Sequence, residues 1–191
     1  MSSQLPILLF LVPFVTAVSM PIFCAKRRSW CQPLTTGAVS VMVVLAVSNL
    51  RVVLSEGSIE YAFGGWTAPL GIAWLNDPLA AMIALTMSAV ALLTLIYGRL
   101  VVSSNLEKSA PYYTLILLFI AALIGIVFAA DLFNVFVFLE MAALTGYALV
   151  GAAGGSALVY AFRYLLIGSF GATLYLLGVS YLYAATGTLN M

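Results

Sequence analysis

Six apolar stretches, each close to the length that crosses a lipid bilayer, constrain this chain more than any other feature of its sequence. A transmembrane helix needs about 20 apolar residues, because the hydrocarbon core is about 30 Å thick. The stretches lie near residues 5–23, 34–54, 77–99, 111–130, 131–150 and 157–184. Of the 191 residues, 64% are apolar and only 7% are charged, against roughly 25% charged in soluble domains. We therefore expect an all-α polytopic membrane protein with six transmembrane helices.

The basic residues predict how the chain is oriented in the membrane. Five of the seven fall in or beside the loops 24–33 and 100–110, which lie on the same side if all six helices cross. These five are Lys26, Arg27, Arg28, Arg99 and Lys108. Short cytoplasmic loops are enriched in Lys and Arg, so we expect both loops to be cytoplasmic and both chain ends to be extracytoplasmic. A signal peptide requires basic residues before its apolar run. None precedes the first apolar stretch here, so we expect that stretch to be a retained helix.

Residues 56–77, between the second and third expected helices, are the one extramembrane segment with a distinct pattern. Turn-forming glycines and a proline separate short runs of aromatic and β-branched residues. We predict a short extracytoplasmic β-hairpin here, with Trp66 and Trp74 as anchors at the membrane interface. Asp77 immediately precedes Pro78, and this pair is typical of an N-cap and first turn that open the third helix.

The chain contains no histidine and only two cysteines, Cys24 and Cys31. It therefore supplies neither a histidine ligand for haem nor a histidine general base. Both thiols lie at the expected cytoplasmic end, where a reducing compartment disfavours a disulfide, and two thiols alone do not complete a metal site. A net charge of +1 gives no indication of nucleic-acid binding. We expect no cofactor, no metal and no nucleic-acid partner.

Three ionisable residues, Asp131, Glu140 and Arg163, fall in or against the expected membrane helices. A charge at the middle of the bilayer costs about 3 kcal/mol on insertion scales, so such residues are candidate functional groups. Asp131 has a structural explanation, because a carboxylate at a helix start accepts backbone N–H bonds and suits the helix dipole. Nine residues separate it from Glu140, which places the two carboxylates on opposite faces of one helix.

Glu140 lies about ten residues from either end of its expected helix, or about 15 Å from each boundary. It cannot cap the helix, and its side chain is too short to reach water. Ala143 leaves room on its face for a partner or a water, and Tyr147 is a candidate hydroxyl relay. Burial favours the neutral carboxyl group whereas a nearby cation favours the carboxylate, so Glu140 is a candidate proton relay. The alternative is a hydrogen bond that only packs two helices together.

The sixth expected helix carries the other candidate residues. Arg163 is either a charge partner for Glu140 on the neighbouring helix or a side chain that extends to the interface. An axial offset of about 10 Å would require extended side chains or a bridging water for a contact between them. Gly168 and Ala172 form a small-x-x-x-small pair, which lets helices approach closely. We expect these two residues to form a packing face.

Residues 131–140 read DLFNVFVFLE, and this segment resembles the helix-five signature of proton-translocating antiporter-like subunits. Such subunits occur in respiratory complex I, membrane-bound hydrogenases and Mrp-type multisubunit sodium/proton antiporters. Residues 182–191 are similar to the end of helix six in the Mrp D-subunit group. Residues 64–78 are similar to the segment of that group that leads from the hairpin into helix three. The resemblance covers nearly the whole chain and corresponds to the N-terminal half of such a subunit.

The resemblance implies that Glu140 pairs with a lysine of helix seven and that water and further ionisable residues extend the route across the membrane. It also implies two parts, with helices one to three in residues 1–110 and an incomplete first antiporter-like repeat in residues 111–191. No seventh helix is present in these 191 residues. The chain is then a fragment, a split subunit whose lysine comes from another polypeptide, or an incomplete product that translocates nothing.

The leading hypothesis is a membrane subunit of a multisubunit monovalent cation/proton antiporter in a bacterial or archaeal cytoplasmic membrane. Its partners would be other membrane subunits, the lipid bilayer, protons and a monovalent cation. One alternative is a proton-pumping subunit of a complex I-like NADH:quinone oxidoreductase or of a hydrogenase, in which any NADH or quinone chemistry belongs to partner subunits. The other is a purely structural membrane subunit.

Overall fold

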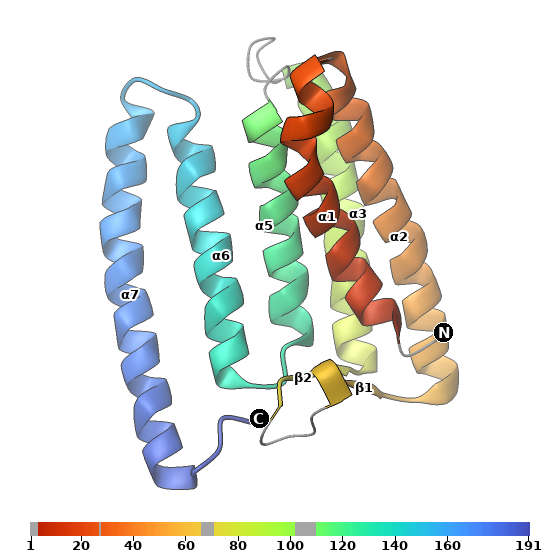
Figure 1. The fold of residues 1–191 in the computed structure, drawn as a ribbon, viewed down its shortest axis with the longest axis vertical. Helices are drawn as coiled ribbons and strands as arrows, with labels where there is room; N and C mark the ends of the chain where they lie inside the picture. The colour runs from red at the N-terminus through yellow and green to blue at the C-terminus, as the bar shows by residue number, and fades with distance from the viewer. Residues whose placement is uncertain (1–3, 27, 66–70, 102–109) are drawn as a thin grey trace.

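The computed structural model describes residues 4–26, 28–65, 71–101 and 110–191. Within these ranges six helices are long and apolar enough to cross a membrane. They are α1 (Leu5–Lys26), α2 (Cys31–Glu56), α3 (Pro78–Val101), α5 (Ala110–Phe128), α6 (Leu132–Gly151) and α7 (Ala157–Thr186). Figure 1 shows them standing side by side along the long axis of the molecule. The prediction of an all-α polytopic membrane protein is confirmed.

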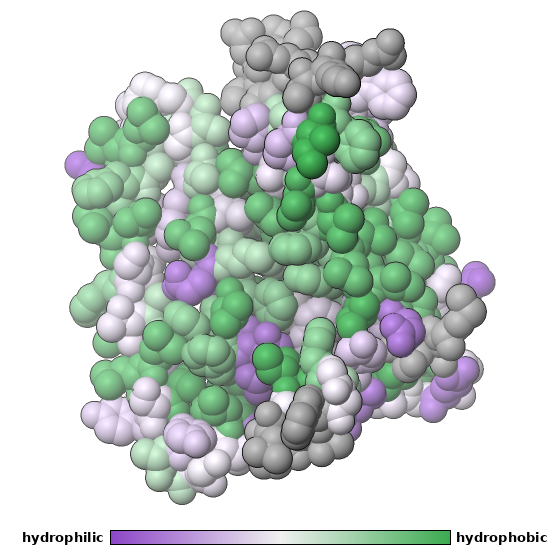
Figure 2. All heavy atoms as spheres, in the orientation of Figure 1, coloured by the Kyte–Doolittle hydropathy of each residue, from purple (hydrophilic) through white to green (hydrophobic). Residues whose placement is uncertain are grey.

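The helices form a compact group of four with two more added at one side. α1 packs against α2 and α5, and α2 packs against α3. α6 then packs against α5, and α7 packs against α6. α7 is the least buried of the six helices, because α6 is the one described helix against which it packs extensively. Figure 2 shows that apolar side chains dominate the visible outer surface, as expected where lipid is the solvent.

The predicted hairpin is present between α2 and α3. Strand β1 (Ile59–Ala62) pairs with β2 (Ala73–Asn76) in antiparallel register, with Ile59 opposite Asn76. A short 3-10 turn, η3 (Phe63–Gly65), follows β1, and a second, η2 (Arg28–Trp30), precedes α2. Figure 1 shows the hairpin at the same end of the bundle as the start of α1 and the C-terminus. This arrangement agrees with chain ends on one side, and the identity of that side remains a prediction.

Two buried amides attach the hairpin to the helices. Asn49 of α2 and Asn76 of β2 are fully buried and exchange reciprocal hydrogen bonds of 3.2 and 2.8 Å between their side chains. Asp77 then caps α3, because its Oδ1 accepts a 2.7 Å hydrogen bond from the Ala80 N–H. Pro78 occupies the first helical position, where a missing N–H costs nothing.

Trp74 lies in the core and does not anchor the hairpin at the membrane interface, so that prediction is wrong for this residue. Its side chain is 1% exposed. The indole is enclosed by aromatic rings from α1, η3, α5 and α6, with centroid separations of 5.1 to 5.9 Å. These rings belong to Phe10, Phe63, Phe128 and Phe138. The other predicted anchor, Trp66, lies outside the described residues.

The connection between α5 and α6 is extended, although the sequence suggests two helices that meet without a break. Residues 129–131 lie between β2 and the C-terminal segment. On one side the Ala130 N–H donates to the Ala73 carbonyl at 3.2 Å, and on the other Asp131 pairs with Asn190. The backbone groups of this connection therefore find partners in neighbouring segments, which explains why α5 ends at Phe128.

Candidate functional site

The start of α6 is fixed by Asp131. Its backbone is extended, and its Oδ1 accepts a 2.6 Å hydrogen bond from the Asn134 N–H. This is the N-cap arrangement in which a side-chain oxygen satisfies one of the free donors of the first turn. The position of Asp131 at the helix start therefore matches the capping role.

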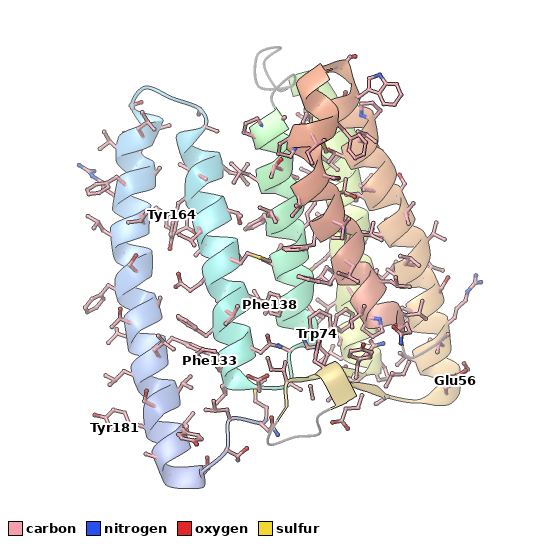
Figure 3. All side chains as sticks on the ribbon, in the orientation of Figure 1. Glu56, Trp74, Phe133, Phe138, Tyr164 and Tyr181 are labelled. Carbon is pink, nitrogen blue, oxygen red and sulfur yellow. The ribbon has the colours of Figure 1, made fainter. Side chains whose placement is uncertain are left out.

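One face of α6 packs closely against α5 through Phe138 and Gly125. A methyl group at Gly125 would lie 2.5 Å from the Phe138 ring, so the ring occupies the space that a side chain would need. Phe138 also meets Phe10 of α1 in an edge arrangement at 5.5 Å. Figure 3 shows Phe138 on the side of α6 that faces α5 and Phe133 on the side that faces α7.

The opposite face of α6 contacts α7 at two levels. At the first level, Tyr147 lies against Gly168, where a methyl group would overlap the Tyr147 hydroxyl, and its ring meets Tyr164 edge-on at 4.6 Å. At the second level, Phe136 stacks on Tyr175 at 6.1 Å, and the Tyr175 hydroxyl donates to the Leu132 carbonyl at 3.1 Å. Figure 3 shows Tyr164 on α7 next to α6.

Glu140 lies between these two contacts on the same face of α6. It follows Phe136 by four residues and precedes Tyr147 by seven, and both spacings return to one helix face. Its side chain is half-buried. Among the described residues it forms no hydrogen bond and no ion pair, but it interacts electrostatically with Tyr147. Eight residues separate it from Leu132 and eleven from Gly151, or about 12 and 16 Å along the axis.

The part of α7 between its two contacts carries small residues. Gly168 receives Tyr147, and Ala172 lies half-buried on the same helix face. A side chain at Gly171 would begin with no neighbouring heavy atom within 4 Å. The predicted packing role of Gly168 is therefore visible as a specific notch for Tyr147. α7 also leaves room near the level of Glu140, which is the condition for a partner or a water to approach the carboxylate.

Arg163 is not brought to Glu140. Its side chain is exposed, and no salt bridge joins the two within the described residues. The residue of α7 that meets α6 at this level is Tyr164, which points about 100° away from Arg163 around the helix. The structure thus agrees better with Arg163 extending to the interface than with a direct ion pair.

Sequence reasoning missed three residues that shape the site. Gly125, Tyr164 and Tyr175 define how α6 is held between its neighbours. The spacing of Tyr164, Gly168 and Tyr175 returns to one face of α7, and this periodicity could have identified the contact face. No comparable pattern marks Gly125. Among the described residues no group of three His, Cys, Asp or Glu side chains is arranged to hold a metal ion.

Comparison with known proteins relates the chain to two kinds of membrane protein. No family model matches it. It is 36% identical over 197 residues to the N subunit of NADH-quinone oxidoreductase from Desulforudis audaxviator, with all of this chain and 38% of the relative covered. It is 31% identical over 186 residues to the D subunit of the Na(+)/H(+) antiporter from Bacillus subtilis, with 97% of this chain and 37% of the relative covered. The chain thus spans less than two fifths of the length of these relatives.

Solved structures show the same fold. One chain in the membrane-bound sulfane sulfur reductase, an archaeal respiratory membrane complex, matches with a TM-score of 0.90 and 29% identity over 98% of this chain and 38% of the other. One chain in the Mrp complex of a Dietzia species matches with a TM-score of 0.84 and 22% identity over 99% of this chain and 35% of the other. The six-helix arrangement with its hairpin is therefore a known membrane architecture.

Proposed function

Because this chain is homologous over 97% or more of its length to the antiporter-like subunits of Mrp antiporters and of NADH-quinone oxidoreductases, we propose that it works as an ion-translocating membrane subunit. The specific proposal is a subunit of a multisubunit monovalent cation/proton antiporter in which Glu140 carries protons. The homology confirms the resemblance to antiporter-like subunits, whereas the proposed role of Glu140 rests on its position in α6.

The observation that carries the proposal is the position of Glu140. A carboxyl group near the middle of a membrane helix costs about 3 kcal/mol on insertion scales unless a partner offsets it. Glu140 has no such partner among the described residues, and the nearby part of α7 is built from small residues. A structural glutamate would instead be expected to hydrogen-bond across the helix contact. An unpartnered carboxyl with room beside it suits a group that takes up and releases a proton.

Tyr147, two helical turns beyond Glu140 on the same face of α6, is the proposed relay. Its ring is held in the notch at Gly168, and its hydroxyl interacts electrostatically with the carboxylate. A phenol hydroxyl both donates and accepts hydrogen bonds, so it can pass a proton to a neighbouring water without a change in its own charge. The axial separation of seven residues, about 10 Å, requires water between the two groups.

The partners are also part of the proposal. We propose that the positively charged side chain that pairs with Glu140 comes from outside the described residues, as the family resemblance to a helix-seven lysine suggests. α7 exposes most of its apolar surface, which suits contact with lipid and with other membrane subunits. We further propose a bacterial or archaeal cytoplasmic membrane, with the basic loops on the cytoplasmic side.

The test is Glu140→Gln in the assembled complex, with Glu56→Gln as the matched control. Glu56 is the last residue of α2 and is exposed, so its neutralisation leaves the membrane interior unchanged (Figure 3). Cation-driven proton movement would be followed by a pH-sensitive dye in inverted membrane vesicles. We expect exchange to be lost in Glu140→Gln while the complex still assembles, and to be normal in Glu56→Gln. Normal exchange by Glu140→Gln would sink the proposal.

A redox-driven pump is the second candidate, and the 36% identity to a subunit of NADH-quinone oxidoreductase favours it. In that case proton uptake would follow NADH or another reductant instead of a cation gradient, and the electron carriers would lie in other subunits. Vesicles energised either by a cation gradient or by a reductant distinguish the two functions. Glu140→Gln should abolish the proton movement that the complex performs under one of these two conditions. A purely structural role predicts that neither is affected, while bulky changes at Gly168 or Ala172 disrupt assembly.

A further inference from the structure

Asp131 has a second carboxylate oxygen that the capping role does not use. Oδ1 accepts from the Asn134 N–H, whereas Oδ2 is buried and has no hydrogen-bond partner among the described residues. The side chain is 7% exposed. An N-cap aspartate normally turns its free oxygen to water, as at the partly exposed Asp77. A buried acceptor that stays unsatisfied costs about 1–3 kcal/mol, so Oδ2 is expected to have a ligand in the membrane-embedded protein.

Two other buried groups, both donors, are in the same condition. The Asn134 side chain is 7% exposed, and its Nδ2 has no partner among the described residues. Trp74 is 1% exposed, and its Nε1 is likewise unpartnered within the described ranges. Trp74 is bridged to Ala129, two residues before Asp131. Because strand residues two apart share a face, Trp74 and Asp131 lie on the same side of this short sheet.

One acceptor and two donors match the requirements of a buried water molecule. Such waters usually make about three hydrogen bonds to polar groups that would otherwise be unsatisfied. A cation fits less well, because two of the three groups are N–H donors, which do not coordinate cations. An anion is excluded by the charge of the carboxylate. The geometry therefore points to water.

We propose that Asp131 and Asn134, with Trp74 as the third group, bind an ordered water molecule at the hairpin end of α6. Asp131 then forms the outer end of a proton route to Glu140, a step that rests on the proposed function. Because the two carboxylates lie on opposite faces of α6, this route passes around the helix through water. On the neighbouring helix, the Tyr175 hydroxyl donates to the Leu132 carbonyl, and its ring stacks on Phe136, one turn before Glu140.

The first test is a high-resolution structure of the assembled complex that resolves ordered water. We expect a water within about 2.7–3.2 Å of both Asp131 Oδ2 and Asn134 Nδ2, and its loss in Asn134→Leu. A map that shows no water at Oδ2, or a side chain of another subunit in its place, would overturn the proposal. This readout does not depend on transport.

The second test is exchange by Asp131→Asn, with Asp77→Asn as the matched control. Asparagine caps a helix as well as aspartate, so both variants should fold, and thermal unfolding of the complex verifies this. We expect Asp131→Asn to lower the exchange rate by about tenfold or more and Asp77→Asn to leave it unchanged. A wild-type rate in Asp131→Asn would refute the route. A water in the map together with normal exchange by Glu140→Gln would refute the proposed function alone.

Discussion

The contact between Tyr147 and Gly168 allows a quantitative test of how α6 and α7 are held together. A methyl group at Gly168 would overlap the Tyr147 hydroxyl and would lie 2.7 Å from the Cζ of the same ring. Added methylene groups in a packed interior cost about 1–3 kcal/mol. The same substitution gains about 1 kcal/mol in helix propensity, so the net loss in Gly168→Ala should reach up to about 2 kcal/mol.

The control is Gly178→Ala on the same helix, where the new methyl group would meet no heavy atom within 4 Å. Gly178→Ala therefore has the gain in helix propensity without an overlap between the new methyl group and a neighbouring side chain. The difference between the two variants therefore isolates the overlap, and we expect it to be about 1–3 kcal/mol. The assay is the free energy of unfolding in mixed micelles titrated with a denaturing detergent.

A double-mutant cycle identifies the group responsible. Tyr147→Phe removes the hydroxyl that the new methyl group would overlap, although the ring carbon at 2.7 Å remains close. The pair Gly168→Ala with Tyr147→Phe should therefore recover part of the loss, with an interaction energy of about 0.5 kcal/mol or more. Gly168→Ala as stable as Gly178→Ala, or no recovery in the double mutant, would show that the notch is not a packing contact.

Two further contacts yield predictions of the same kind. Gly125→Ala should destabilise the protein by about 1–3 kcal/mol because its methyl group would meet the Phe138 ring, and Phe138→Leu in the same chain should restore part of the loss in the micelle titration. Asn49→Leu should cost about 1–3 kcal/mol because it leaves the buried Asn76 amide unsatisfied, and Asn49→Leu together with Asn76→Leu should cost less than the single change if the amide pair is the cause.

The sequence predicts the helices and the hairpin because lipid imposes a strong constraint on each segment separately. A stretch of about 20 apolar residues has few alternatives to a helix in a bilayer. Glu140 is recognised as a candidate for the same reason, since a mid-helix carboxylate stands out without knowledge of its neighbours. The rotation of α6 is not predictable in this way, because apolar residues surround the whole helix and lipid-facing and protein-facing sides look alike.

The pairing of residues 129–131 with β2 and with the C-terminal segment could not be predicted either. It depends on backbone hydrogen bonds between residues that are more than fifty positions apart. The burial of Trp74 is unpredictable for a related reason. Its place beside a turn suggested an interfacial anchor, but rings from four separate elements enclose it. Local pattern indicates where a chain turns, whereas the three-dimensional contacts decide which side of the turn is buried.

The two ring-and-notch contacts have a joint consequence for Glu140. Phe138 and Tyr147 are nine residues apart on α6, which places them on opposite sides of the helix. Each ring fills a notch made by a glycine of the neighbouring helix, Gly125 on one side and Gly168 on the other. Rotation of α6 alone would move both rings out of these notches and lose both contacts. Since α6 is held by a ring contact on both sides, we expect any change in what Glu140 contacts to come from displacement of α7 or from a group that enters beside it.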